Sequence, residues 1–187
     1  MPLDSQALFE INTFVRGGFE QRDRIVEILT EETYEPGELD EAEVQSAVDA
    51  AITLHERGKS AWPIRTDCER LDAVFSALTK KGIVAIQYAG YTQSDGYEDI
   101  SEAYHGRIDK DEVVGYCFYH GQDLARAVNG DGLYLAFGPI DPKQEETEGP
   151  RVGEMIANEL RDAGFDVRWN GGVDQRIFVP EIDWKRR

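Results

Sequence analysis

The stretch TDCERLDAVFSALTKKGIVAIQY, residues 66–88, contains the change of pattern that decides the fold. In its first part, apolar side chains recur three or four positions apart and predict one buried helical face, made by Leu71, Val74, Phe75 and Leu78. Thr66 and Glu69 have the spacing of a capping box at the start of this helix, and Gly82 is suited to end it. Beyond Gly82 the apolar residues follow a period of two, which is typical of a strand. The stretch therefore predicts a helix that leads directly into a strand.

Upstream of this stretch, the sequence predicts three more helices. Apolar residues at helical spacing occupy residues 7–15, 25–29 and 44–52. Asp40 is a favourable N-cap for the third of these helices, and Gly58 is a favourable residue to close it. The first third of the chain is therefore expected to be helical.

Downstream, the sequence predicts strands that alternate with helices. Five segments are rich in β-branched and aromatic residues or alternate apolar with polar positions: residues 83–88, 113–119, 133–137, 165–169 and 176–179. The last two flank the turn residues Asn170-Gly171-Gly172 and predict a hairpin. Residues 150–163 predict a helix with Pro150 at its first position, and the acidic segment 141–148 before it is expected to be a solvated loop.

Together these elements predict an α+β fold, in which N-terminal helices are followed by a mixed β-sheet of about five strands with helices packed on it. We expect an acidic helical N-terminal segment, residues 1–60, packed on a main α+β domain, residues 61–187. Trp62-Pro63 is too brief a junction to act as a flexible linker.

The charge of the chain excludes some classes of partner and favours another. With 20 Lys and Arg against 37 Asp and Glu, the net charge is −17, which argues against a nucleic-acid binder or a protein held on anionic lipid. No Lys or Arg occurs between Ile25 and Glu56, and this interval contains the predicted partner-binding carboxylates Glu31, Glu32, Glu35, Glu38, Asp40, Glu41 and Glu43. Such a field speeds association with a basic protein, for example a nuclease or a basic toxin. The alternative is an acidic solvent face that keeps the protein soluble.

Cysteine usage and the N-terminus predict a cytoplasmic protein. Cys68 and Cys117 lack C-x-x-C spacing and are expected to be reduced and buried, and no signal peptide is apparent. The longest uncharged stretch, residues 82–94, is too short and too polar to cross a bilayer.

Three polar loops follow predicted strands and suggest a ligand site. They occupy residues 91–97, 120–123 and 138–141. If the three strands are parallel neighbours, the loops share the carboxyl edge of the sheet, where open sheets commonly bind ligands. The predicted ligand-binding residues are Gln93, Ser94, Asp95, His120, Gln122 and Asp123.

Within these loops, His120 precedes Asp123 by three residues, and a histidine oriented by a carboxylate can act as a general base. Ser94 or Cys68 is the candidate nucleophile, and Asp95 is a further catalytic candidate. The alternative is that Asp123 caps a helix and His120 makes local hydrogen bonds. Because the sequence has no G-x-S-x-G elbow, phosphate-binding motif or diagnostic metal-ligand spacing, whether it is an enzyme stays open, and we expect no cofactor and no metal.

Several short motifs resemble a bacterial family catalogued as a domain of unknown function. They are Trp62-Pro63, Thr66-Asp67-Cys68, Gln93-Ser94-Asp95-Gly96-Tyr97, Phe118-Tyr119-His120-Gly121-Gln122-Asp123 and Leu133-Tyr134-Leu135-Ala136-Phe137-Gly138. The resemblance runs from about Trp62 to Arg187 and implies a bacterial cytoplasmic protein, but no activity.

Two main hypotheses about function follow. The first is an acidic protein-binding or inhibitory module, of the immunity-protein or regulator type, that engages a basic partner. The alternative is a small-molecule-binding protein or enzyme that uses the 93–95 and 120–123 loops. A third option is a structural domain within a larger assembly, and the sequence does not predict the oligomeric state.

Overall fold

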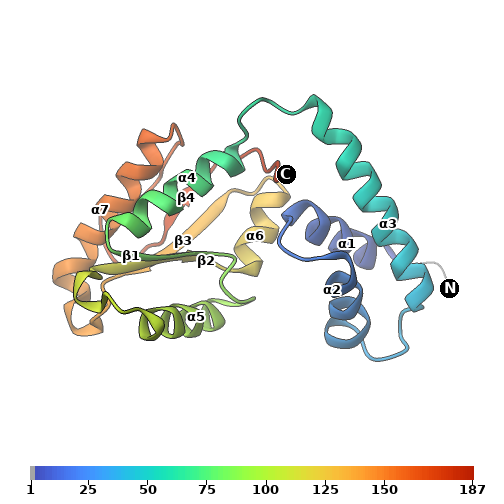
Figure 1. Cartoon of the computed structure of the whole chain (residues 1–187), viewed down its shortest axis with the longest axis horizontal. Helices are drawn as coiled ribbons and strands as arrows, with labels where there is room; N and C mark the ends of the chain where they lie inside the picture. Colours follow the sequence, from blue (N-terminus) through green and yellow to red (C-terminus); the bar gives the residue numbers. More distant parts are fainter. Residues whose placement is uncertain (1–2) are drawn as a thin grey trace. The chain divides into compact units, whose positions relative to one another are not determined.

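The computed structural model describes residues 3–187, which group into two compact units (Figure 1). The first unit contains the N-terminal helices up to Thr66 together with Trp184–Arg187, and the second contains Asp67–Asp183. The last four residues of the chain therefore belong with its N-terminal helices and not with the segment that precedes them.

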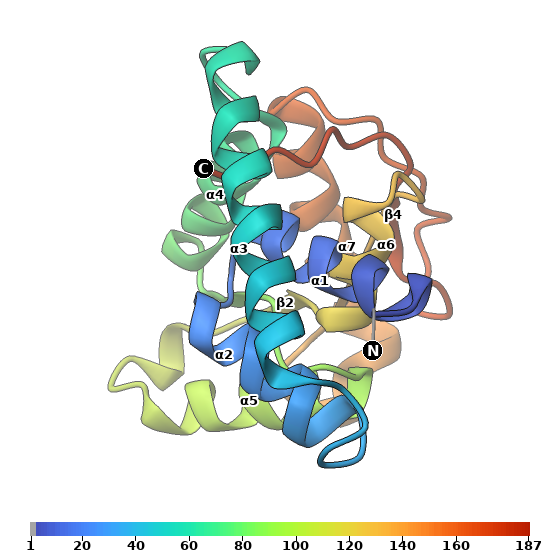
Figure 2. The ribbon, with the colours of Figure 1, turned by 90° about the vertical axis from the view of Figure 1, so that its right-hand side faces the viewer.

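The first unit is helical, as the periodicity predicts. Its main helices are α1 (Ser5–Gly17), α2 (Arg22–Glu27), which continues as a π-helical segment over Ile28–Thr33, and α3 (Glu41–Gly58). Figure 2 shows α3 running alongside α1 and α2, and the three helices share one apolar cluster built on Ile11, Ile25, Leu29, Val44 and Val48. The predicted cap is present, because the Asp40 carboxylate accepts from the backbone N–H of Glu43 at 3.0 Å.

The C-terminal residues are anchored in this helical unit by hydrogen bonds and a cation–π contact. Trp184 is buried, and its indole N–H donates to the carbonyl of Gly17 at 3.4 Å. Arg187 donates to the carbonyl of Pro63 at 2.6 Å, and the guanidinium of Arg186 lies 4.1 Å from the ring centroid of Phe19. Both ends of the described chain therefore belong to one compact unit.

The second unit is a four-stranded mixed sheet with helices on both faces, which confirms the α+β class. Its elements are α4 (Asp67–Lys80), β1 (Ile83–Gln87), α5 (Gln93–Gly106), β2 (Gly115–Tyr119), α6 (Gly121–Val128), β3 (Leu133–Gly138), α7 (Glu145–Asp162) and β4 (Ile177–Val179). The strand order is β1-β2-β3-β4, with β1 and β2 parallel and the other pairs antiparallel. In Figure 1, α5 covers one face of the sheet, and α4 and α7 lie on the other.

The sheet has four strands rather than the predicted five. Residues 165–169 contribute only an isolated bridge, in which Arg168 and Phe178 exchange backbone hydrogen bonds of 2.8 and 3.0 Å. The chain then leaves the ladder because the indole N–H of Trp169 donates to the carbonyl of Gly172 at 2.9 Å, which closes a local turn.

The helix expected from residue 150 starts earlier, so the prediction of a solvated loop over residues 141–148 was wrong for most of it. A 3₁₀ turn covers Pro142–Gln144 and α7 begins at Glu145, which leaves Pro150 inside the helix. Glu145, Glu146 and Glu148 lie in the first turns, where carboxylates interact favourably with the helix dipole. Acidic residues that looked like a loop are therefore a favoured helix start.

The condition for a shared edge, that the three strands run parallel, is met by β1 and β2 but not by β3, which runs antiparallel to β2. The connecting helix α6 is only eight residues long. Gly130 and Gly132, both at positive φ, reverse the chain as soon as that helix ends, so β3 enters the sheet where β2 leaves it. The 138–141 loop consequently lies at the opposite end of the sheet from the other two polar loops.

Within residues 3–187, no helix is both long and apolar enough to cross a membrane.

Candidate functional site

Two of the three predicted loops lie side by side. Because β1 and β2 are parallel, the loops that follow them leave the same end of the sheet. The backbone N–H of Gly121 donates to the carbonyl of Gly90 at 2.9 Å, and that of Gln122 donates to the carbonyl of Tyr91 at 3.2 Å. Backbone hydrogen bonds therefore join the 120–123 loop to Gly90 and Tyr91, at the start of the loop that follows β1, whereas the 138–141 loop is not part of this edge.

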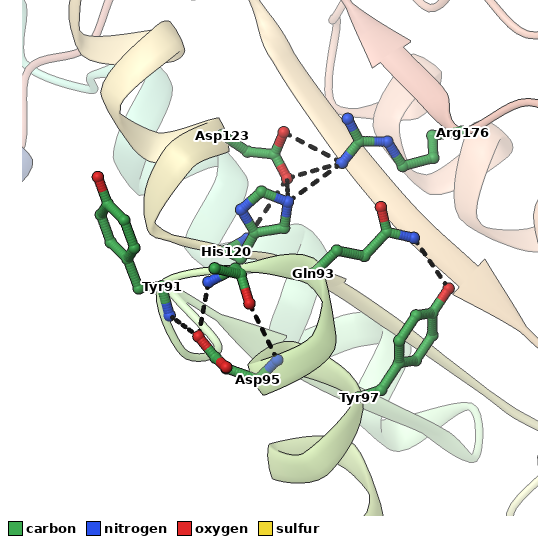
Figure 3. Close-up of polar contacts among 8 residues, drawn as sticks. Tyr91, Gln93, Asp95, Tyr97, His120, Asp123 and Arg176 are labelled. Carbon is green, nitrogen blue, oxygen red and sulfur yellow. Dashed lines mark hydrogen bonds and ion pairs between the residues drawn. The ribbon is translucent and has the colours of Figure 1, made fainter.

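The loop after β1 is a tight turn held by Asp95. Its carboxylate accepts from the backbone N–H groups of Tyr91 and Thr92 at 3.2 and 2.8 Å, and the Thr92 hydroxyl accepts from the Asp95 N–H at 3.4 Å (Figure 3). These hydrogen bonds, chiefly the one from the Thr92 backbone, lower the pKa of Asp95. Tyr88, just before the turn, is the one non-glycine residue at positive φ (+56°) in the described chain. Asp95 is thus committed to building the turn, at a place where the backbone is strained.

The other loop supplies a buried His–Asp pair that meets an arginine from a distant part of the sequence. His120 and Asp123 are 4% and 1% exposed, and His120 Nε2 lies 3.0 Å from Asp123 Oδ2. Arg176, which directly precedes β4, donates through Nη1 to Asp123 Oδ1 at 3.1 Å and Oδ2 at 2.9 Å. Figure 3 shows the guanidinium reaching both side chains, with Nη1 at 3.4 Å from His120 Nε2. The buried carboxylate therefore holds a histidine on one side and an arginine on the other.

The surroundings of His120 favour its neutral imidazole. Burial lowers the pKa of His120, the Asp123 carboxylate opposes this shift, and the Arg176 guanidinium adds to it. A carboxylate can only accept, so Nε2 carries the proton, and Nδ1 is a buried nitrogen with no hydrogen-bond partner.

The predicted nucleophiles are not assembled around this histidine. Ser94 is exposed, and no hydrogen bond joins it to His120. Cys68 is buried in α4, and the second thiol, Cys117, is fully buried in β2, where burial raises its pKa. The arrangement therefore provides an oriented arginine and a neutral imidazole, but no nucleophile in contact with a base.

Within residues 3–187, the side chains of the remaining predicted ligand residues, Gln93 and Gln122, make no hydrogen bond with the His120–Asp123–Arg176 group. Gln93 donates through its side-chain amide to the Tyr97 hydroxyl at 3.1 Å, and Gln122 is exposed. Arg176 was missed by sequence reasoning because 53 residues separate it from Asp123. The only signal available was its position at the start of a predicted strand.

The first unit contains a separate acidic groove of about 1010 Å³. Four of the seven predicted partner-binding carboxylates line it, together with Asp4: these are Glu31, Glu38, Asp40 and Glu41. Its apolar part comprises Leu3, Tyr34, Pro36 and Leu39, and none of its lining residues is a Lys or Arg. Burial, with a contribution from Glu10, raises the pKa of Tyr34 to about 12. The groove thus combines an acidic rim with a partly apolar floor.

The other three predicted carboxylates occupy different environments. Glu32 is ion-paired with Arg24, and Glu43 is partly buried on α3. Glu35 is exposed beside the groove and donates its backbone N–H to the Glu38 carboxylate at 3.1 Å.

Metal binding finds no support in the part of the chain that the structure describes. Among residues 3–187, no three His, Cys, Asp or Glu side chains are grouped so that they could hold a metal ion.

Comparison with known proteins identifies a family but no characterised relative. Neither the curated proteins nor the solved structures gave a match. A family model described as "Domain of unknown function (DUF6891)" matches residues 3–187. The match includes the N-terminal helices, which the motif resemblance beginning near Trp62 left out. The chain therefore belongs, over nearly its whole length, to the DUF6891 family of domains of unknown function.

Proposed function

We propose that this protein is a binding module of the immunity-protein or regulator type, whose acidic groove engages a basic segment of another protein. The observation that carries the proposal is that exposed carboxylates without cationic partners surround a partly apolar floor. Both of its cysteines, Cys68 and Cys117, are buried and unbridged, as is usual in the bacterial cytoplasm, which we propose as its compartment.

The exposed carboxylates of the helical unit divide into two kinds. Away from the groove they are neutralised locally, since Arg22 pairs with Asp49 at 2.6 Å and Arg24 pairs with Glu27 at 2.9 Å. The exposed carboxylates at the groove make no ion pair with residues 3–187. They are Glu31, Glu35, Glu38 and Glu41. If the acidity served only solubility, unpaired charge could lie anywhere on the surface, but within this unit it gathers at one groove.

The floor of the groove supplies what charge alone does not. Protein interfaces combine an apolar centre with a polar rim, and aromatic residues are enriched at the centre. Tyr34 and Leu39 provide partly buried apolar surface, and Pro36 is exposed beside them. A complementary segment carries aliphatic or aromatic side chains between lysines and arginines, so that its apolar residues contact the floor while its cations meet the rim.

Selection from a peptide library tests the proposal without a prior choice of partner. Random peptides displayed on phage are panned at low salt against the full chain, and binders are then measured on two variants of equal net charge. The groove variant carries E31Q, E35Q, E38Q and E41Q, and the control carries E98Q, E102Q, D111N and E146Q at exposed positions of the second unit.

We expect the selected peptides to be rich in Lys and Arg with interspersed apolar residues. Four exposed charge pairs at a few tenths of a kcal/mol each correspond to a loss of affinity of roughly tenfold in the groove variant. The control variant should bind as the parent does, and high salt should weaken binding to the parent. Selection of neutral or acidic peptides, or equal loss in both variants, would overturn the proposal.

A further inference from the structure

We infer that the second unit contains a binding site for a small organic oxyanion, a carboxylate or a phosphate monoester, centred on Arg176. The site is a pocket of about 370 Å³ lined by Tyr134, Arg168, Trp169, Gln175, Arg176 and Phe178. This volume is in the range of pockets that take small molecules. Both charged lining residues are arginines, although the chain as a whole carries a net charge of −17.

Arg176 is oriented by the buried Asp123 carboxylate, and this contact uses only one of the three nitrogens of the guanidinium. Both oxygens of Asp123 accept from Nη1, at 3.1 and 2.9 Å. The remaining donors, Nε and Nη2, make no hydrogen bond with residues 3–187. These two nitrogens form the edge of a guanidinium that binds a carboxylate or phosphate through two parallel hydrogen bonds.

The surroundings keep this edge in place and accessible. The guanidinium of Arg176 lies 4.9 Å from the ring centroid of Tyr134, and its partner Asp123 is only 1% exposed. The ring and the buried carboxylate together hold the guanidinium in place. The Arg176 side chain is 31% exposed, which leaves it open to a ligand. Neutralising Asp123 needs only the Nη1 group of Arg176. It explains neither the two unused nitrogens of that guanidinium nor the second arginine that lines the pocket.

That second cation is Arg168, whose backbone is hydrogen-bonded and whose side chain is largely exposed. Its N–H and C=O are bonded to Phe178 at 2.8 and 3.0 Å, and its side chain is 68% exposed, with Nε at 3.7 Å from Asp166. Arg126 adds a third guanidinium, 5.3 Å from the ring centroid of Tyr134. An anion held by Arg176 would thus share the pocket with the Arg168 side chain, while Arg126 contacts the Tyr134 ring and is not part of the lining.

Apart from Gln175, the rest of the lining is aromatic, and this sets the chemical character of the ligand's body. Tyr134 and Phe178 stack at 4.3 Å between centroids, and Trp169 is fixed against Phe137 at 5.5 Å. Rigid aromatic walls favour a flat or apolar body attached to the oxyanion over a highly hydrated inorganic ion.

Arginine side-chain NMR on the full chain tests the site directly. The Nε–H signals of ¹⁵N-labelled protein are followed during titration with acetate, benzoate, inorganic phosphate and phenyl phosphate. Three variants accompany the parent: R176K, which keeps the charge beside Asp123 but loses the fork; R168Q, which leaves that pair intact; and R151Q, a control on α7 whose side chain is 78% exposed.

We expect a saturable shift of the Arg176 Nε–H signal, with at least tenfold tighter binding of one of the two ring-bearing probes than of its ring-free counterpart. Benzoate responding alone assigns a carboxylate ligand, and phenyl phosphate responding alone assigns a phosphate monoester. R176K should weaken binding at least tenfold, R168Q about threefold, and R151Q not at all. A shift that does not saturate, or binding that survives in both R176K and R168Q, overturns the inference.

Discussion

The acidic groove of the helical unit and the arginine pocket of the sheet unit are built on opposite principles. The groove is lined by five carboxylates and no cation, and these side chains lie in the π-helical segment, on the exposed turn that follows it and at helix starts. The pocket is lined by two arginines and no carboxylate, and its central guanidinium is held by the buried Asp123. Exposed unpaired charges steer a large partner over distance, whereas a charge fixed by a buried counter-ion is oriented for a small one at contact.

The largest expected effect is the loss of stability on removing the buried Asp123 carboxylate. D123A should lower the free energy of unfolding of the Asp67–Asp183 unit by about 3 kcal/mol, because His120 and Arg176 both lose their acceptor. E38Q in the groove should change stability by no more than about 0.5 kcal/mol, because Glu38 is exposed. Hydrogen exchange followed by mass spectrometry measures each unit separately. Similar losses for the two variants would show that Asp123 is not the support we describe.

A second contrast concerns glycines in the two regions. A Cβ on Gly96 would overlap the ring of Phe118, which is fully buried, so G96A should cost about 2 kcal/mol. Gly37, beside the groove, has a φ of +87° and no atom within 4 Å of an added Cβ, so G37A should cost about 1 kcal/mol of backbone strain alone.

Thermal unfolding of both glycine variants gives the measurement. Equal losses would mean that the loop after β1 is as loosely packed as the groove turn, which would weaken the case for a rigid site beside His120.

The two regions also differ in how far the sequence reveals them. Local signals predicted the helices of the first unit and the end of α4 correctly: Asp40 caps α3, Gly58 ends it, and Gly82 separates α4 from β1. The groove was accessible to prediction for the same reason, since most of its carboxylates are neighbours along the chain.

The arginine pocket depends on information that is not local. Alternating apolar residues at 133–137 are the same for either strand direction, so the antiparallel course of β3 could not be predicted from them. Only the pairing of β3 with β4 brings Arg176 to Asp123, and no pattern in the sequence links these two residues.

A smaller effect compares His55, which is partly buried in the first unit, with His120, which is buried in the second. Burial lowers the pKa of His55 in the first unit and of His120 in the second. In the unfolded chain each histidine binds a proton near pH 6.5, whereas in the folded chain it does so only at lower pH. Protonation therefore favours the unfolded chain, so the free energy of unfolding is unaffected by these histidines above pH 6.5 and falls as the pH drops below it. The slope is at most about 1.4 kcal/mol per pH unit for each histidine.

Unfolding between pH 7.5 and 5.5 should therefore show a slope that H120Q flattens in the second unit and H55Q flattens in the first. H105Q, which removes an exposed imidazole, serves as the control. A slope unchanged in H120Q would show that the Asp123 carboxylate compensates fully for the burial of this ring.

The smallest effect separates a functional acidic groove from an acidic surface that only aids solubility. Like charges gathered without cations repel one another, and relief of this repulsion should exceed the loss of the favourable Glu41 charge at the start of α3, so the groove variant with E31Q, E35Q, E38Q and E41Q should be more stable than the parent, by roughly 0.5 kcal/mol in the first unit. The matched control, whose four neutralised carboxylates lie in the second unit, should leave the stability of the first unit unchanged. A partner-binding role predicts that the same groove variant gains stability and loses affinity for basic peptides, because the repulsion is relieved only when cations arrive. Gain without loss would leave the unpaired carboxylates as a solvated face, and loss of both would show that they support the fold.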